Sequence, residues 1–406
     1  MKNIFIKDVK QKKNAEFLEV TYSVIIRGNP YNLTYKISGE SIDSVPMLCD
    51  AVVVNLLYYA VRHGLSYVSD FPISEKLYYN LTKHVIPQLC LINNPDNDMI
   101  KIKMPLSKEV YHGEWIGTGI SLGVDSFTTI HEYTEKCTLE EYRLTHLVHL
   151  KTGAHHGQLG YYNQQTEDEL FLAENAKVKE FCQKHKYKLI TIETNLHALI
   201  CTEFGYGFDT THTYRNLGCI LLLQNQFDKY YYASACNLDK FDIKLSKDVA
   251  YYEKWLIPHI SNESISFYSA NTNMTRIQKV AYLSKFEDTY DHLHVCWYAT
   301  DNCGCCKKCI RTLVTLDVLG VLDKYSRAFN LERYYNNRES IISEVILLRK
   351  CDMSYMEIYN FMVRNNYKMP SRVTLFKTTF RIAIQKINAL GLAKVLKIVN
   401  TRILKK

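Results

Sequence analysis

Two short segments of this sequence combine residue types that could bind an anion or a metal ion. The first is Ser121-Leu122-Gly123-Val124-Asp125-Ser126. It follows a segment with strand character, Trp115–Ser121, and precedes a segment with helical character, Phe127–Lys136. A turn in that position points backbone N–H groups and the positive end of the helix dipole at one place. Its glycine would let the backbone approach an anion, and its two serine hydroxyls would add donors.

Asp125 gives the same segment a carboxylate. It could cap the following helix or hold a magnesium ion that is bound to phosphate groups. The segment does not end in the Gly-Lys-Ser/Thr of a Walker loop, so it would be a different kind of phosphate loop. The alternative is an unrelated strand–turn–helix corner with a capping serine.

The second segment is rich in cysteine. Cys303, Cys306 and Cys309 have the spacing C-x2-C-x2-C, and Cys296 precedes them. Four thiolates can surround zinc tetrahedrally, and Gly304 permits the tight turn between two ligands. Cys305 is then left over. We therefore expect a structural Zn²⁺ site with a role in folding, and an iron–sulfur cluster is the main alternative.

The composition limits the class of protein. Of 406 residues, 47% are hydrophobic and 23% are charged, which is typical of a globular protein. No apolar run opens the chain as a signal peptide would, and no apolar stretch is long enough to span a bilayer. We therefore expect a cytoplasmic protein with reduced thiols and no membrane span.

The net charge of +8 is unevenly distributed. The chain has 50 Lys and Arg and 42 Asp and Glu, and nine of the basic residues but none of the acidic ones lie in 371–406. The remainder is almost neutral, which does not indicate a nucleic-acid-binding body. The basic tail could be a helix that packs on the body, or a surface for an anionic partner or a membrane.

Residues 1–105 are expected to form a small α+β accessory domain. Residues 1–40 alternate apolar and polar positions around a turn at Gly28-Asn29-Pro30, which predicts an antiparallel hairpin. Helical patterns follow at Val45–His63 and Ser74–Cys90.

Residues 106–325 are expected to form an α/β domain. Beyond Trp115–Ser121, segments with strand character alternate with helical segments, which predicts a parallel sheet with helices on both faces. The expected strands are Arg143–Lys151, Tyr187–Glu193 and Tyr230–Ala235, and the expected helices are Phe127–Lys136, Asp168–His185 and His212–Lys229. Residues 326–406 are expected to form a helical, basic C-terminal region.

The loop and the cysteines together carry a resemblance. Ser121–Ser126 resembles the Ser-Gly-Gly-x-Asp-Ser signature of the PP-loop ATP pyrophosphatases, with Leu122 in place of a glycine. With Cys296 and the Cys303–Cys309 cluster, the chain is similar to the 7-cyano-7-deazaguanine synthase (QueC) branch over residues 114–320. Tyr214-Arg215-Asn216 and Met274-Thr275-Arg276 match further landmarks of that family in order, and Thr152–His156 stands where the family has a Gly-Gln-x-His-like turn.

The resemblance implies an adenine nucleotide α-hydrolase-like fold and an ATP-dependent ligase. The loop would bind ATP, Asp125 would act with Mg²⁺, and the four cysteines would bind Zn²⁺. Arg215 and Arg276 would contact phosphate or carboxylate groups, and Lys151 and His156 would lie at the carboxyl end of the sheet, where His156 could handle a proton.

The chain departs from the family in its substrate segment. After Asn237 it reads Leu238-Asp239-Lys240-Phe241-Asp242-Ile243, without the family's Tyr-Pro-Asp-Cys element. Deazaguanine recognition is therefore not carried over. The resemblance leaves out the first hundred residues and the tail, which look like extra domains of larger QueC-like proteins from polysaccharide and antiviral-defence loci.

The expected reaction forms an amide or a nitrile and splits ATP into AMP and pyrophosphate. A carboxylate or amide, with a 7-deazaguanine as one candidate, would be adenylated for attack by an amine or ammonia. Two alternatives are an amidotransferase-like enzyme of surface polysaccharide synthesis and a catalytically degenerate nucleotide-binding scaffold in a defence system. Partners consistent with these hypotheses are ATP, a small carboxylate or deazaguanine-like substrate, a protein substrate or partner, and a second copy in a homodimer.

Overall fold

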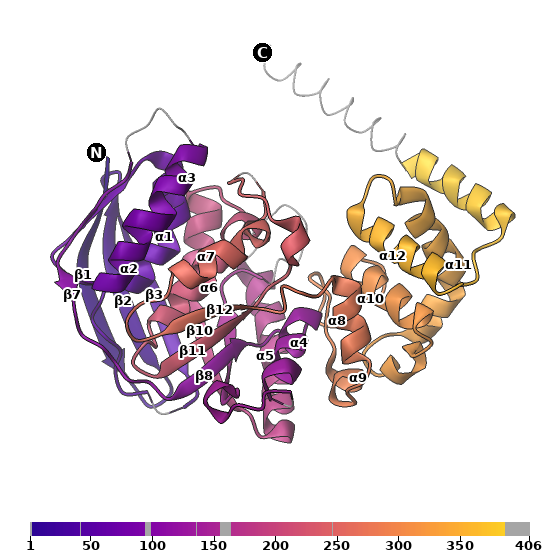
Figure 1. Cartoon of the computed structure of the whole chain (residues 1–406), viewed down its shortest axis with the longest axis horizontal. Helices are drawn as coiled ribbons and strands as arrows, with labels where there is room; N and C mark the ends of the chain where they lie inside the picture. Colours follow the sequence, from indigo (N-terminus) through magenta and orange to yellow (C-terminus); the bar gives the residue numbers. More distant parts are fainter. Residues whose placement is uncertain are drawn as a thin grey trace, which may run out of the picture. The chain divides into compact units, whose positions relative to one another are not determined.

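A computed structural model describes residues 2–40, 42–93, 99–134, 136–154, 164–245 and 247–385, without the side chains of 164–166. The chain divides into two compact units. The larger unit comprises Met1–Leu283 and His292–Thr300, and the smaller unit comprises Ser284–Asp291 and Asp301–Lys406. Figure 1 shows the elements of both units.

The larger unit contains a ten-stranded mixed sheet in the order β12-β11-β8-β9-β10-β3-β2-β1-β4-β6. Strands β12 to β10 of this order pair in parallel, β10 to β1 pair antiparallel, and β4 and β6 are again parallel. The strands are β1 Asn3–Lys13, β2 Leu18–Ile26, β3 Asn29–Ser38, β4 Ser66–Ser69, β6 Ile102–Lys103, β8 Trp115–Gly119, β9 His146–Lys151, β10 Lys188–Thr194, β11 Phe227–Ala233 and β12 Ser266–Ala270. A separate two-stranded sheet joins β5 (Ile73–Ser74) to β7 (Leu106–Ser107). The expected α/β architecture with a mostly parallel sheet is confirmed.

The antiparallel part of the sheet begins with the hairpin expected from the sequence. β2 and β3 are joined by Arg27 and Gly28, whose φ angles are 55° and 91°. Two consecutive positive φ angles are typical of a two-residue turn whose twist matches that of the flanking strands. Alternate residues of β2 are buried, from Leu18 to Ile26, so one face of the hairpin belongs to the core.

Helices cover both faces of the parallel strands. Figure 1 shows α4 and α5 on one face, and α1, α6 and α7 on the other. Neighbouring parallel strands need such crossover helices, because after each strand the chain must return to the end of the sheet where the next strand begins. The helices of this unit are α1 Asp50–His63, α2 Glu75–Asn80, α3 Ile86–Asn93, α4 Val124–Thr134, α5 Gln164–His185, α6 Phe208–Leu221, α7 Glu253–His259 and α8 Arg276–Leu283, with π-helical turns at Leu81–Val85 and Ala198–Glu203.

The first hundred residues share the sheet and the core of the larger unit. β3 pairs with β10 from Tyr35↔Thr194 to Ser38↔Thr191. Asn55 of α1 donates to the carbonyl oxygens of Tyr214 and Arg215 in α6, at 2.9 and 3.0 Å. The two compact units therefore have other boundaries than the domains that the sequence predicted, which were divided near residues 105 and 325. The predicted domain assignment stays a prediction.

Two elements differ from the expected pattern. The helix expected over His212–Lys229 ends at Leu221, and Phe227 already belongs to β11. β12 has no counterpart among the expected strands. Both differences follow from pairing: β11 is held between β8 and β12, and these partners are distant in the sequence.

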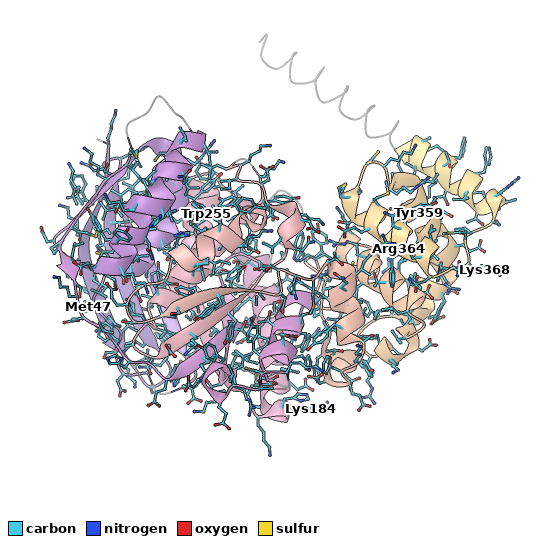
Figure 2. The ribbon with its side chains drawn as sticks, in the orientation of Figure 1. Met47, Lys184, Trp255, Tyr359, Arg364 and Lys368 are labelled. Carbon is cyan, nitrogen blue, oxygen red and sulfur yellow. The ribbon has the colours of Figure 1, made fainter. Side chains whose placement is uncertain are left out.

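The smaller unit is helical, as expected for the C-terminal region. Its helices are α9 Asp288–His292, α10 Lys307–Val318, α11 Leu331–Leu348, α12 Met353–Arg364 and a further helix over 372–385, with a 3₁₀ turn at Leu322–Tyr325. Arg338 of α11 donates to both carboxylate oxygens of Asp317 in α10, at 2.7 and 2.8 Å. The guanidinium of Arg349 lies over the ring of Tyr359, and Figure 2 labels Tyr359 and Arg364 on α12. Within the described part of the chain, no helix combines the length and hydropathy needed to cross a membrane.

Candidate functional site

The segment Ser121–Ser126 connects β8 to α4. Leu122 has φ +52°, in the left-handed region that glycine adopts readily and that costs other residues about 1–2 kcal/mol. Its side chain is only 1% exposed, and its carbonyl oxygen accepts a hydrogen bond of 2.9 Å from the backbone N–H of His294. Packing therefore holds a leucine in a backbone conformation for which the signature uses glycine.

The serines and the glycine of this segment form one tight turn. Ser126 Oγ donates to the carbonyl oxygen of Gly123 at 3.0 Å and lies 3.4 Å from Ser121 Oγ. A Cβ atom at Gly123 would lie 3.2 Å from Ser121 Oγ, closer than side chains normally pack. Ser121 itself is exposed. The turn thus presents a hydroxyl to solvent beside the N-terminus of α4.

Asp125, in the first turn of α4, is bound by two cations from α8. Arg276 Nη1 donates to its Oδ2, and Lys279 Nζ donates to its Oδ1 at 2.9 Å. Lys279 is 1% exposed and also donates to the carbonyl oxygen of Ser234, just after β11, at 2.6 Å. The structure therefore brings Asp125 and Arg276 together, while their predicted catalytic roles stay predictions.

The sequence pattern alone did not single out Lys279. A usable signal was present, because Arg276 and Lys279 are three residues apart in a helical pattern and so share one face of the helix.

The loop has a defined place in the sheet. β8 lies between β9 and β11, and the strand order runs outward in both directions from β8. The connections that follow β8 and β11 therefore leave the carboxyl ends of these two strands toward opposite faces of the sheet. In open α/β sheets, ligands bind in the crevice that such a reversal creates. Ser121–Ser126 and Ser234 both lie at this edge.

Arg215, predicted to contact phosphate or carboxylate, is completely buried. It donates to the carbonyl oxygens of Thr152 and Tyr206, at 3.0 and 3.2 Å, and faces His197 Nδ1 at 2.5 Å. Burial lowers the pKa of Arg215 to about 10, although nearby acidic groups oppose that shift. These contacts give Arg215 a clear structural role in holding the turn after β9, while its contact with a substrate stays a prediction.

Gly153 explains why that turn is packed so closely. It has φ +107°, and a Cβ atom there would lie 2.1 Å from Nδ1 of His197. Only glycine can occupy this position without moving the histidine that faces Arg215.

Lys151 is the last residue of β9 and is mostly buried. Its ammonium group pairs with Asp168 of α5 and lies 3.8 Å from a carboxylate oxygen of Glu193 in β10. Its predicted catalytic role is untested by these contacts, which fix the end of β9 to its neighbours. His156, predicted beside it, lies outside the described residues.

A second polar cluster occupies the same edge of the sheet. The buried Glu253, at the start of α7, accepts from the backbone N–H of Ala235 at 3.0 Å and from Thr213 Oγ1 at 3.2 Å. Burial raises the pKa of Glu253 to about 7, although His212 and these two donors oppose the shift.

The cluster continues through Tyr232, whose hydroxyl lies 2.9 Å from His212 Nδ1 and accepts from Asn216 Nδ2 at 3.3 Å. Glu253 was not recognised from the sequence, because a single glutamate at the start of a helix looks like any surface residue.

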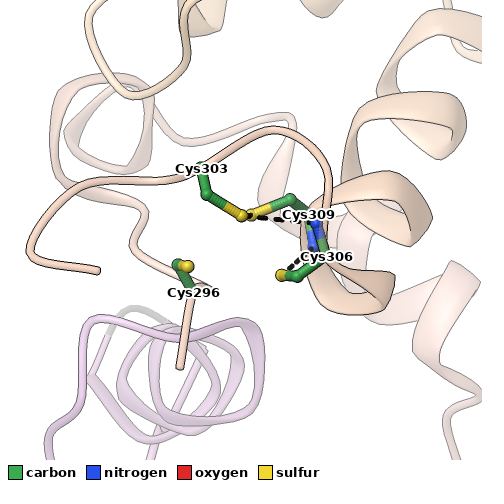
Figure 3. Close-up of side chains that lie close together, drawn as sticks. All are labelled: Cys296, Cys303, Cys306 and Cys309. Atoms are coloured by element: carbon green, nitrogen blue, oxygen red, sulfur yellow. Dashed lines mark hydrogen bonds between the residues drawn. The ribbon is translucent and has the colours of Figure 1, made fainter. Parts of the chain in front are cut away.

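The four predicted zinc ligands come together. The Sγ atoms of Cys296, Cys303, Cys306 and Cys309 all lie within 4.8 Å of one another, and Figure 3 shows the four side chains converging. Cys303 Sγ and Cys309 Sγ are 3.9 Å apart. Tetrahedral zinc with bonds of about 2.3 Å would place its sulfurs about 3.8 Å apart. The cluster could therefore hold a metal ion such as zinc.

Backbone N–H groups donate to three of these four sulfurs. Cys303 Sγ accepts from the N–H of Cys306 at 3.3 Å, and Cys306 Sγ accepts from the N–H of Cys309 at 3.4 Å. Tyr298 donates to Cys296 Sγ at 3.4 Å. Cys305, expected to be the spare cysteine, is exposed and stays outside the group of four, although its Sγ lies 3.6 Å from that of Cys303.

Comparison of the chain with protein-family models, with curated proteins and with solved structures returns no match.

Proposed function

We propose that the protein is a PP-loop ATP pyrophosphatase that uses ATP to join a nitrogen to a carboxylate or amide, as in the QueC-like enzymes it resembles. One observation carries the proposal. The segment Ser121–Ser126 opens α4 at the carboxyl end of the parallel strand from which the sheet order reverses. That place combines a helix N-terminus, free access for Ser121 and a crevice expected for nucleotides.

The loop would hold the phosphate groups of ATP. The positive end of the α4 helix dipole at this place would attract phosphate oxygens. The positive φ of Leu122 turns the backbone so that the buried leucine side chain points into the core. The departure from glycine in the signature is therefore compatible with a working loop.

Asp125, Arg276 and Lys279 would set the charge beside the phosphates. Asp125 already binds two cations, so Mg²⁺ would be held chiefly by phosphate oxygens with at most one carboxylate from this group. Arg276 is the more exposed of the two cations and could turn from Asp125 to a phosphate oxygen, while the buried Lys279 would keep Asp125 in place.

ATP would supply an activated acceptor. The acceptor's oxygen attacks the α-phosphorus, the α–β phosphate bond breaks, and pyrophosphate leaves. A nitrogen nucleophile then displaces AMP from the activated carbon. The chain's own contribution is to hold the leaving pyrophosphate against the N-terminus of α4, where fixed dipoles stabilise the charge that develops on it. The acceptor is a carboxylate or amide, with 7-deazaguanine carboxylate as one candidate.

The four cysteines would bind Zn²⁺ in a structural role, since four protein ligands leave no open position for a substrate.

The products formed from ATP test the proposal. The purified protein is incubated with ATP, Mg²⁺ and a panel of carboxylates and amides with ammonia, and the products are identified by mass spectrometry. AMP and pyrophosphate are expected. Formation of ADP would contradict the loop assignment, and nucleotide binding without turnover would leave the nucleotide-binding scaffold. The absence of both binding and turnover would overturn the proposal.

Asp125→Asn makes that test specific to the site. The change keeps the shape of the side chain but removes the charge that Arg276 and Lys279 share, so we expect turnover to fall at least about 100-fold. Glu132→Gln, the same chemical change two turns along α4, is the matched control and should retain activity. Thermal unfolding of both variants separates lost chemistry from lost folding, and full activity in a folded Asp125→Asn protein would remove Asp125 from the mechanism.

A further inference from the structure

The helix over 372–385 is anchored to the smaller unit along one face. Thr374 Oγ1 donates to Glu339 Oε2 at 2.6 Å, and Arg381 pairs with Glu344 at 3.1 Å. Thr378 between them is only 3% exposed. Both carboxylates belong to α11, so this polar face of the helix is directed toward α11.

A second face of the same helix is apolar and open to solvent. Its residues and their exposed fractions are Val373 63%, Phe376 75%, Phe380 64% and Ile384 42%. At 100° per residue these four positions fall within an arc of about 80°, so they form one continuous stripe. A packed helix normally buries its apolar face and exposes its polar one, and this helix does the reverse.

The charges that this helix itself carries beside the stripe have one sign. Arg372 and Lys377 are both exposed beside it, and residues 371–406 contain nine Lys and Arg but no Asp or Glu. The rest of the chain is almost neutral, so the positive charge of the protein is concentrated in this segment. An apolar stripe bordered by cations is complementary to a surface that has negative charges above an apolar layer.

We propose that the helix over 372–385 is a docking surface for an anionic phospholipid membrane, with the apolar stripe inserted among the acyl chains and the cations at the headgroups. A second copy of the chain fits less well, because two such faces would bring like charges together. A purely ionic partner such as a nucleic acid would leave two phenylalanines in water. The proposal does not rest on the proposed ATP chemistry.

Vesicle binding by the full-length protein tests this surface. Vesicles of phosphatidylcholine mixed with phosphatidylglycerol are compared with vesicles of phosphatidylcholine alone by co-sedimentation. We expect binding to the anionic vesicles only, weakening as salt is raised. The double change Phe376→Ser and Phe380→Ser should lower the partition coefficient at least about tenfold, since two aromatic side chains no longer leave water.

Matched controls keep the test falsifiable. Met353→Ser removes an equally exposed apolar side chain from the same unit and should leave binding unchanged. Circular dichroism confirms that the variants fold, which we expect because the replaced side chains are exposed. Arg372→Gln with Lys377→Gln should weaken binding to anionic vesicles while leaving the apolar stripe intact.

Several results would overturn the proposal. The wild type could fail to bind anionic vesicles, or the phenylalanine variant could bind as well as the wild type. A dimer that becomes monomeric in the phenylalanine variant, without vesicle binding, would assign the stripe to a second copy. Binding to poly-L-glutamate as strong as that to anionic vesicles would show an attraction that needs charge alone, and therefore an acidic partner.

Discussion

At the scale of single residues, the turn after β8 depends on a conflict between backbone and side chain at Leu122. The left-handed backbone disfavours any residue with a Cβ atom, while the buried side chain contributes to the core. Burial of a leucine is worth about 2–5 kcal/mol, more than the 1–2 kcal/mol of backbone strain. The leucine is therefore tolerated. Because its backbone is strained, we expect the glycine variant at this position to be more stable than the alanine variant, the reverse of the usual order.

Leu122→Ala should destabilise the protein more than Leu122→Gly, by about 0.5–1 kcal/mol in the free energy of unfolding. Both variants lose the buried side chain, but only glycine also relieves the positive φ. Urea denaturation at constant pH measures the difference. At Leu147, a buried residue in β9 without a positive φ, the order should be the usual one, with alanine more stable than glycine. The same order at both positions would mean that the turn relaxes in solution.

Glu253 makes the free energy of unfolding depend on pH, and its contribution can be separated from those of the other ionisable groups. Its pKa in the folded protein, about 7, is above the ordinary value of 4.5. Between these values the folded state binds more protons than the unfolded state, so the free energy of unfolding falls as pH rises. This loss of stability is complete above the pKa of Glu253 in the folded protein, and it is absent below its pKa in the unfolded chain.

Replacement of this carboxyl by an amide should remove that loss. The stability of Glu253→Gln relative to the wild type is expected to rise by about 3 kcal/mol between pH 4.5 and pH 8. Ionisable groups distant from Glu253 are common to both proteins, so their contributions cancel in the difference. Urea unfolding at several pH values gives the result, and a difference that does not change with pH would contradict a raised pKa.

At the scale of elements, the cysteine cluster determines where α10 begins. Cys306 is the N-cap of this helix, its Sγ accepts from the backbone N–H of Cys309, and Cys309 is already inside the first turn. Two of the four sulfurs therefore belong to the start of a helix. A metal ion bound by these sulfurs would fix the helix and the preceding turn at Gly304 together.

Cys306→Ser should abolish stoichiometric metal binding and lower the midpoint of thermal unfolding, because three thiolates and a hydroxyl hold zinc weakly. Cys305→Ser is the matched control, since this exposed cysteine lies outside the group of four and its loss should leave the metal content unchanged. Elemental analysis of both proteins measures the metal and distinguishes zinc from iron. Equal metal content in the two variants would show that the ligand set is different.

At the scale of the whole molecule, the sheet continues from the N-terminal hairpin into the parallel strands. β3 and β10 are neighbours in it, and Asn55 connects α1 to α6 through two hydrogen bonds. If residues 1–105 unfold together with the rest of the larger unit, damage to their core must be felt throughout that unit.

Leu33→Ala tests this cooperativity. Leu33 lies in β3 and is completely buried, so the change should cost about 2–5 kcal/mol. The three tryptophans, at 115, 255 and 297, all lie outside residues 1–105, and Figure 2 labels Trp255. We expect the unfolding midpoint reported by tryptophan fluorescence to fall with that reported by circular dichroism. Leu91→Ala, at an exposed position of α3, should change neither, and an unchanged tryptophan midpoint in Leu33→Ala would indicate an independent N-terminal domain.

Local chemistry in the sequence predicted the hairpin of β2 and β3, most of the alternating strands and helices, and the four cysteines as one group. Those features depend on the alternation of apolar and polar residues, on turn residues such as Gly28, and on the spacing of the cysteines. Each of these signals is present in a short stretch of sequence. The resemblance of the sequence to a known family also placed Asp125 and Arg276 among the predicted site residues, and their roles stay predictions.

Only the tertiary structure decided the features that depend on distant partners. It joined β3 to β10, ended α6 at Leu221 and added β12, because a strand forms where a neighbour offers hydrogen bonds. It placed Lys279 against Asp125 and buried Arg215 and Glu253, because burial is set by the elements that pack around a residue. The sequence alone determined which residues could do chemistry, and the packing decided which of them meet.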